Sequence, residues 1–144
     1  MSSTPTERFE SASAPMPEVK GGVVPYLQVS NASEASAFYQ RAFGAIEVYR
    51  VPGDEQGRTM HIHLYINNGS LMLSDPFPEF GHPLEKPQAF TLNLQVADID
   101  MWWERALAAG VEVVLPLQEM FWGARYGQVR DPFGVMWAFN QPLK

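Results

Sequence analysis

The chain contains no cysteine, and this absence excludes three kinds of chemistry together. Without thiols there is no disulfide, no thiolate nucleophile and no thiolate metal ligand. Histidine is also scarce, with three residues in a chain of 144. A metal site or a general base would therefore depend on a few imidazoles and on carboxylates.

Positive charge is in short supply as well. Ten Lys and Arg residues face sixteen Asp and Glu residues, which gives a net charge of −6. This balance argues against nucleic acid as a partner, because phosphate binding requires a basic face. No stretch approaches the roughly 18 apolar residues of a membrane-spanning helix, so we expect no membrane partner. Residues 1–20 lack the apolar centre of a signal peptide, and their Ser, Thr, Pro and Glu content predicts a disordered extension of a cytoplasmic protein.

An internal repeat is the strongest positive signal in the sequence. Residues 27–48 and 94–113 both read as strand, helix, small-residue stop and strand, and Leu27 and Leu94 are 67 residues apart. Two copies are too few for a stacked repeat protein, so one domain with pseudo-twofold symmetry is expected. We divide the single domain 21–144 into module one (21–76), a linker (77–88) and module two (89–144).

Each copy contains one helix with recognisable ends. Asn31 and Glu34 form a capping pair for a helix over 33–43, and Asp98 is the expected N-cap of the second helix. Apolar residues at helical spacing predict that both helices pack on sheets; they are Ala35, Phe38, Tyr39, Ala42 and Phe43 in the first helix and Ile99, Trp102, Trp103, Ala106 and Leu107 in the second. With the flanking strands, each module is read as β-α-β-β-β, which is an α+β fold class.

The strands alternate between two kinds of face. In the strand at 59–66, the aliphatic residues Ile62 and Leu64 oppose polar and aromatic ones, and in the strand at 89–96 Phe90 and Leu92 do so. The apolar face matches the helices. The opposite face carries almost no Lys or Glu, which indicates a partly enclosed surface for a ligand. Its candidate ligand-binding residues are Tyr26, Gln28, His61, His63, Tyr65, Met72, Thr91 and Asn93. Alternatively, this face is a homodimer interface.

His61 and His63 are the candidate catalytic residues. At positions i and i+2 of a strand they share a face, with Cα atoms about 6.6 Å apart. Two such imidazoles can share a divalent metal ion, or one can act as a general base. Potential third ligands of such a metal are Asp75, Glu79, His82 and Gln28. The alternative is that both histidines hydrogen-bond within the wall of the cleft.

A glycine-punctuated loop carries Trp122, Arg125 and Tyr126, which can close over a flat or anionic ligand. The alternative is an ordered loop whose tryptophan fills the core and whose arginine pairs with a local carboxylate. The following segment, 131–134, reads Asp-Pro-Phe-Gly and predicts a type I turn.

These segments together resemble a known superfamily. The FYQRAFGA run (38–45), the AGVEV run (109–113) and FWGARYGQVRDPFGVMW (121–137) are similar to the vicinal oxygen chelate superfamily of glyoxalases, bleomycin-resistance proteins and extradiol dioxygenases, and most to its PhnB-like branch. The resemblance implies a curved eight-stranded mixed sheet around a cleft, and a homodimer. The positions that hold metal ligands in the superfamily's enzymes are here Val24, Met72, Thr91 and Ala138, none of which is a ligand for a divalent metal.

The leading hypothesis is therefore a protein that binds a small organic ligand without a metal cofactor. A second hypothesis is a glyoxalase-type lyase or isomerase that uses His61 and His63 with a divalent ion or as a proton relay. A third is a dimer-forming domain with no small ligand. The sequence leaves open whether the protein is an enzyme.

Overall fold

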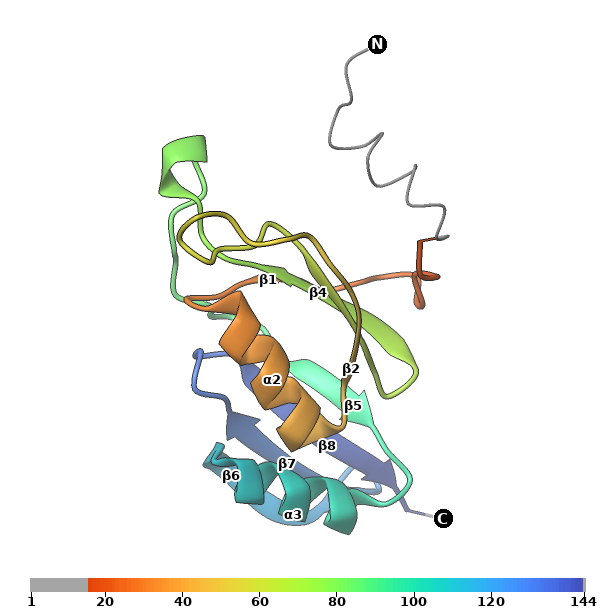
Figure 1. Ribbon diagram of the computed structural model, residues 1–144. Coiled ribbons are helices and arrows are strands. Elements are labelled where there is room, and N and C mark those ends of the chain that lie inside the picture. Colours follow the sequence, from red (N-terminus) through yellow and green to blue (C-terminus); the bar gives the residue numbers. More distant parts are fainter. Residues whose placement is uncertain (1–15, 144) are drawn as a thin grey trace.

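The structure is a computed structural model that describes residues 16–143. Its elements follow the order expected from the repeat (Figure 1). They are β1 (Tyr26–Gln28), α2 (Ala32–Phe43), β2 (Ile46–Arg50), β3 (Ile62–Ile66), β4 (Gly69–Ser74), the 3₁₀ helix η1 (Pro78–Phe80), β5 (Leu92–Gln95), α3 (Ile99–Ala109), β6 (Glu112–Met120), β7 (Ala124–Arg130) and β8 (Met136–Pro142).

The eight strands form two four-stranded mixed sheets, one in each module. Their orders are β1-β4-β3-β2 and β5-β8-β7-β6. In each sheet the first strand of the module pairs in parallel with the last, so that Leu27 lies opposite Leu73 and Leu94 opposite Phe139. The other pairs are antiparallel. The predicted α+β class with two βαβββ modules is confirmed.

Both helices begin where side chains satisfy their first backbone N–H groups. The Asn31 side chain accepts from the Glu34 N–H at 3.1 Å and donates to the Glu34 carboxylate at 3.0 Å, as the capping pattern predicts. The Asp98 carboxylate accepts from the Met101 N–H in α3. Helix α2 ends at Gly44, whose φ of 65° lies in the left-handed region that glycine adopts without strain.

One continuous core lies between the helices and the apolar faces of the sheets. On β3, Ile62 and Leu64 are fully buried, as the alternation predicts. Helices α2 and α3 lie side by side and join the modules (Figure 1). Two expected core residues are not in it, because Phe90 is 44% exposed before β5 begins and Leu107 is 40% exposed on α3. The described residues form no helix with both the length and the apolar content to cross a membrane.

The predicted turn at 131–134 is present and also links the modules. The Asp131 carboxylate accepts from the Phe133 and Val135 N–H groups within the turn. Its other oxygen accepts from the Trp137 indole and, at 2.6 Å, from the hydroxyl of Tyr39 on α2. Burial and the adjacent Asp131 charge raise the pKa of Tyr39 well above its usual value, so the phenol remains a donor.

Most of the predicted N-terminal extension lies outside the described residues. Its last part contacts module one: the Glu18 carbonyl accepts from the Tyr65 hydroxyl, and the backbone of Lys20 pairs with Ser70. The ordered domain therefore includes residues just before Gly21.

Candidate ligand-binding site

The polar face predicted for module one exists and is centred on three paired strands. Tyr26 on β1 lies opposite Met72 on β4, which lies opposite His63 on β3. Because neighbours across a sheet share a face, these three side chains form one row. His61 and Tyr65 flank His63 on the same side of its strand.

His61 is held at one edge of this row. The Tyr26 hydroxyl lies 3.0 Å from His61 Nδ1 and also donates to the Met60 carbonyl at 2.9 Å. Burial lowers the pKa of His61 and raises that of Tyr26, so both groups are neutral at pH 7. A neutral imidazole beside a phenol can accept or pass on a proton.

His63 is buried, and its contacts lie within the sheet. Its Nε2 lies 2.7 Å from the Ser70 hydroxyl, and its ring meets the ring of Tyr65 edge to face. Burial, and secondarily the charge of His61, lowers the pKa of His63. The hydrogen-bonding alternative weighed for the histidine pair therefore describes His63 better than it describes His61.

A cavity of about 580 Å³ opens beside Tyr26, the residue that contacts His61, and is called here the module-one cavity. Tyr26 and Gln28 of β1 form one wall, and Met60 and Ser74 continue it. The opposite wall comes from the segment that follows β4. The lining is mainly aromatic and aliphatic, with a phenol, an amide, a hydroxyl and an imidazole; its residues are Tyr26, Gln28, Met60, Ser74, Phe77, Phe80 and His82.

The opposite wall is the start of the predicted linker, which folds back over the sheet. Phe77 and His82 pair through two backbone hydrogen bonds of 2.7 and 3.0 Å. The Arg58 guanidinium lies 4.4 Å from the Phe77 ring and forms ion pairs with Glu79 at 2.6 Å and Asp54 at 3.0 Å. Arg58 thus fastens this wall to the loop before β3.

The potential metal ligands named from the sequence do not gather around the histidine pair. No three His, Cys, Asp or Glu side chains among residues 16–143 gather into a group that can hold a metal ion. The Asp75 carboxylate, one potential third ligand, instead accepts from the backbone N–H groups of Ala32 and Thr59 at 2.8 Å each. Glu79, another, accepts two hydrogen bonds from Arg58. Of the potential third ligands, His82 and Gln28 line the module-one cavity.

The candidate residues of module two lie apart from this cavity. Thr91 and Asn93 line a separate cavity of about 300 Å³ between the modules. The Trp122 indole donates to Asn140, and its ring meets that of Tyr126 at 5.1 Å. Arg125 forms a bidentate ion pair with Asp100, the local pairing that was the alternative for this loop. Of the residues assigned to the cleft, Tyr26 and Gln28 line the module-one cavity, and His61 contacts it only through Tyr26.

Sequence reasoning missed Met60, Ser74, Phe77 and Phe80. The signal for the last two was present: two phenylalanines stand in a proline-rich segment, 75–88, that has no periodic pattern to explain them. Aromatic residues in an irregular segment need an apolar surface to cover, and here they cover the cavity.

Several known proteins are similar to this chain in sequence or in structure. An uncharacterized protein of Mycobacterium bovis is 40% identical over 132 residues, which cover 88% of this chain and 86% of the relative. The crystal structure of TioX from Micromonospora sp. ML1 superimposes with a TM-score of 0.69 at 29% identity and covers 85% of this chain and 99% of its own. The PhnB protein of Bacillus cereus shares the fold, with a TM-score of 0.61 at 19% identity over 84% of this chain and 99% of its own.

The family model for the Glyoxalase/Bleomycin resistance protein/Dioxygenase superfamily matches residues 22–139. That range includes both modules and every residue that lines the module-one cavity. The chain therefore belongs to the Glyoxalase/Bleomycin resistance protein/Dioxygenase superfamily.

Proposed function

We propose that the protein binds an uncharged, largely apolar organic molecule in the module-one cavity and needs no metal ion to do so. The observation that carries this proposal is the lining of the cavity. Three aromatic side chains and a methionine supply apolar surface, and Gln28, Ser74 and His82 supply polar contacts. Among residues 16–143, no Lys, Arg, Asp or Glu lines it. Small-molecule sites in general combine such apolar walls with a few polar groups that fix orientation.

The volume and the reinforced wall support the same proposal. About 580 Å³ is within the usual range for sites that enclose a drug-sized molecule. Because Arg58 fastens the Phe77 wall before any ligand arrives, little ordering is needed on binding. Binding would then consist of burial between aromatic faces, with the Tyr26 hydroxyl and the Gln28 amide orienting the ligand.

The test is a thermal-shift screen of the protein with uncharged aromatic compounds, followed by calorimetry on compounds that stabilise it. Phe80 is 63% exposed at the cavity, so Phe80→Ala removes contact surface without opening the core. We expect this variant to bind about tenfold more weakly, the usual cost of losing one buried aromatic contact.

The matched control is Phe121→Ala, which removes a phenyl ring that is 94% exposed on module two. It should bind with unchanged affinity. Equal losses in the two variants, or no stabilising compound at millimolar concentration, would contradict the proposal.

One contact favours a second candidate function, a histidine-dependent lyase or isomerase. Tyr26 lines the cavity and its hydroxyl lies 3.0 Å from His61 Nδ1, so the pair can pass a proton to or from a bound substrate. In that case His61→Ala would abolish turnover of an identified substrate while the melting temperature stayed nearly constant. Full turnover in that variant would eliminate this candidate.

We also propose that a second copy of the chain is the protein partner. The resemblance to the superfamily implies a homodimer, and Val23 is an apolar residue, 93% exposed, that such a contact would cover. Light scattering at micromolar concentration should give a dimer mass, and Val23→Asp should lower it toward that of a monomer. A monomer mass for the unaltered protein would contradict this.

A further inference from the structure

A second cavity, here called the junction cavity, lies where the two modules meet and has a volume of about 370 Å³. Lys20, Tyr65 and Asn67 approach it from the side of module one, and Met101, Trp102 and Arg105 from α3. Within the part of the chain that the structure describes, no carboxylate lines it, although the chain as a whole carries a net charge of −6. Two cations in one cavity of an acidic protein need an explanation.

Of the two cations, Arg105 gives the stronger evidence for a ligand. Its Nε is buried and has no hydrogen-bond partner within the described residues. The guanidinium stacks on the Trp102 ring at 4.5 Å and presses against the end of α2, where a Cβ added to Gly44 would lie 2.6 Å from Nη1. Burial lowers its pKa, the direction for a cation whose charge is not compensated. A buried donor without an acceptor is costly and rare in folded proteins, so the group is poised for an external acceptor.

The other arginines show how unusual this is. In the described part of the chain, Arg50, Arg58, Arg125 and Arg130 all form ion pairs with carboxylates. Arg41 is exposed and stacks on the Phe38 ring at the surface, where water can satisfy its donors. Among residues 16–143, Arg105 is the arginine that combines burial with an unsatisfied donor.

Lys20 brings the second charge and is held in place. Its backbone N–H donates to the Ser70 hydroxyl at 2.8 Å, and its carbonyl accepts from the Ser70 N–H at 2.9 Å. Its ammonium lies 4.3 Å from the centre of the Tyr65 ring. It forms no ion pair with a described carboxylate, so its charge also remains available.

We propose that the junction cavity is a binding site for a small organic oxyanion that carries a flat apolar group. Arg105 and Lys20 meet the phosphate or carboxylate oxygens, and the Trp102 and Tyr65 rings cover the apolar part. Planar guanidinium groups suit such oxygens because they donate two parallel hydrogen bonds. The site is distinct from the module-one cavity, which has no charged lining and takes an uncharged ligand.

The proposed site also has a mechanical consequence. Tyr65 and Asn67 belong to one module and Trp102 and Arg105 to the other, so a bound anion would bridge them. A ligand that binds the folded state alone stabilises it by an amount that grows with the logarithm of the ligand concentration once that concentration exceeds the Kd. Occupancy of the junction cavity should therefore appear as a rise in melting temperature.

The experiment titrates the protein with phenyl phosphate, benzoate and the uncharged amide benzamide, followed by calorimetry and by melting temperature. We expect phenyl phosphate to bind the junction cavity most tightly and benzoate less tightly. Benzamide, an uncharged aromatic molecule, can enter the module-one cavity, so any affinity that it shows should not depend on Arg105. Arg105→Met should weaken phenyl phosphate at least tenfold, which corresponds to loss of a charge-assisted contact. Lys20→Met should weaken it by a smaller factor, and added salt should weaken it in the unaltered protein.

Arg41→Met is the matched control, because it removes an arginine stacked on an aromatic ring outside the cavity. It should bind phenyl phosphate as the unaltered protein does, and so should Phe80→Ala, which reports on the other cavity. Arg105→Met keeps the apolar stem and removes an unpaired donor, so we expect it to fold; Lys20→Met on the surface provides an independent variant. A loss of benzamide affinity in Arg105→Met as large as the loss of benzoate affinity, no binding of phenyl phosphate at 10 mM (about the limit of useful affinity), or unchanged phenyl phosphate affinity in both cation variants would overturn the proposal.

Discussion

The two modules share a backbone plan but fill the space between helix and sheet in opposite ways. Ser36 and Trp103 occupy the same place in their helices, since 36 − 32 equals 103 − 99. Ile62 and Gly127 also occupy the same place in their sheets. Leu27 pairs with Leu73, which pairs with Ile62. The matching Leu94 pairs with Phe139, which pairs with Gly127. Module one packs a small helix residue over a large strand residue, and module two does the reverse.

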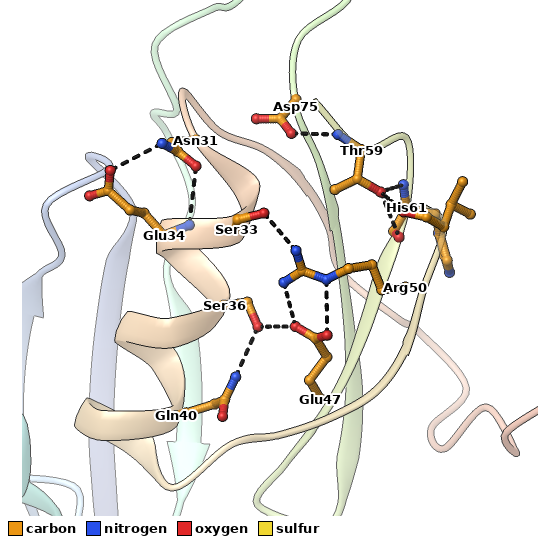
Figure 2. Close-up of polar contacts among 11 residues, drawn as sticks. Asn31, Ser33, Glu34, Ser36, Gln40, Glu47, Arg50, Thr59, His61 and Asp75 are labelled. Carbon is orange, nitrogen blue, oxygen red and sulfur yellow. Dashed lines mark hydrogen bonds and ion pairs between the residues drawn. The ribbon is translucent and has the colours of Figure 1, made fainter. Parts of the chain in front are cut away.

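Because of this exchange, the helix residue makes polar contacts in module one and apolar packing contacts in module two. In module one the small Ser36 leaves room for polar contacts: its hydroxyl donates to Glu47 at 2.6 Å, and Glu47 pairs with Arg50 (Figure 2). In module two the Trp103 ring lies against Gly127. The repeat thus preserves volume and backbone rather than residue type, as dense packing requires.

The largest effect should come from forcing module two toward the packing of module one. A Cβ at Gly127 would lie 2.5 Å from Trp103 and 3.2 Å from the Leu117 backbone. We expect Gly127→Ala to lower the free energy of unfolding by about 3 kcal/mol through overpacking, measured by urea denaturation.

The same change in a Trp103→Ala background provides the check. With the ring gone, the added methyl has room, so its cost should fall well below that in the unaltered protein. If Gly127→Ala lowers the free energy of unfolding equally in both backgrounds, the Trp103 ring is not what makes glycine necessary at position 127.

A smaller effect should separate the starts of the two helices. The first N–H of α2, at Ala32, donates to the Asp75 carboxylate, whereas the first N–H of α3, at Ile99, donates to the amide oxygen of Gln141. The Asp75 carboxylate also accepts from the Thr59 N–H (Figure 2). Asp75→Asn should cost about 2 kcal/mol, because it removes charge from a helix start and turns an N–H₂ toward a donor. Gln141→Ala should cost about 1 kcal/mol by thermal melting. A larger loss at Gln141 would reverse the comparison.

The smallest predicted effect is the pH dependence of module one. His61 and His63 have folded-state pKa values lowered by burial, so the unfolded chain takes up protons first as the pH falls. Stability should be complete above about pH 6.5, the usual histidine value, and should decline as the pH falls below it. Melting from pH 8 to 5 would show this, and His63→Gln should flatten the curve; a steeper curve in that variant would contradict the assignment.

The sequence predicts well what depends on local pattern. The capping pair at Asn31 and the alternation around Ile62 place a helix and a buried strand face with no knowledge of the rest of the chain. It cannot place the wall of the module-one cavity, because Phe77 and Glu79 are positioned by Arg58, about twenty residues earlier and across a loop. Such contacts depend on three-dimensional proximity, which periodicity does not encode.

Cavity lining is hard to predict for a related reason. Tyr26 and Gln28, which line the module-one cavity, were identifiable because they lie on a strand, where alternation assigns a face. Trp122 comes from a turn whose direction no pattern determines. Arg125, which was expected in the same loop, lies in β7 instead and pairs with Asp100. The single buried donor of Arg105 is visible only when its surroundings are known.

The ion pairs of Arg58 should make ligand affinity in the module-one cavity depend on salt concentration in an unusual direction. Salt ordinarily strengthens the burial of an uncharged apolar molecule when the ions are of the excluded kind, such as sulfate. Here one wall is tied down by surface ion pairs with Asp54 and Glu79, which dissolved ions screen. An uncharged ligand should therefore bind more weakly as the salt concentration rises. The salt acts on the ion pairs that hold the cavity wall and not on the ligand itself.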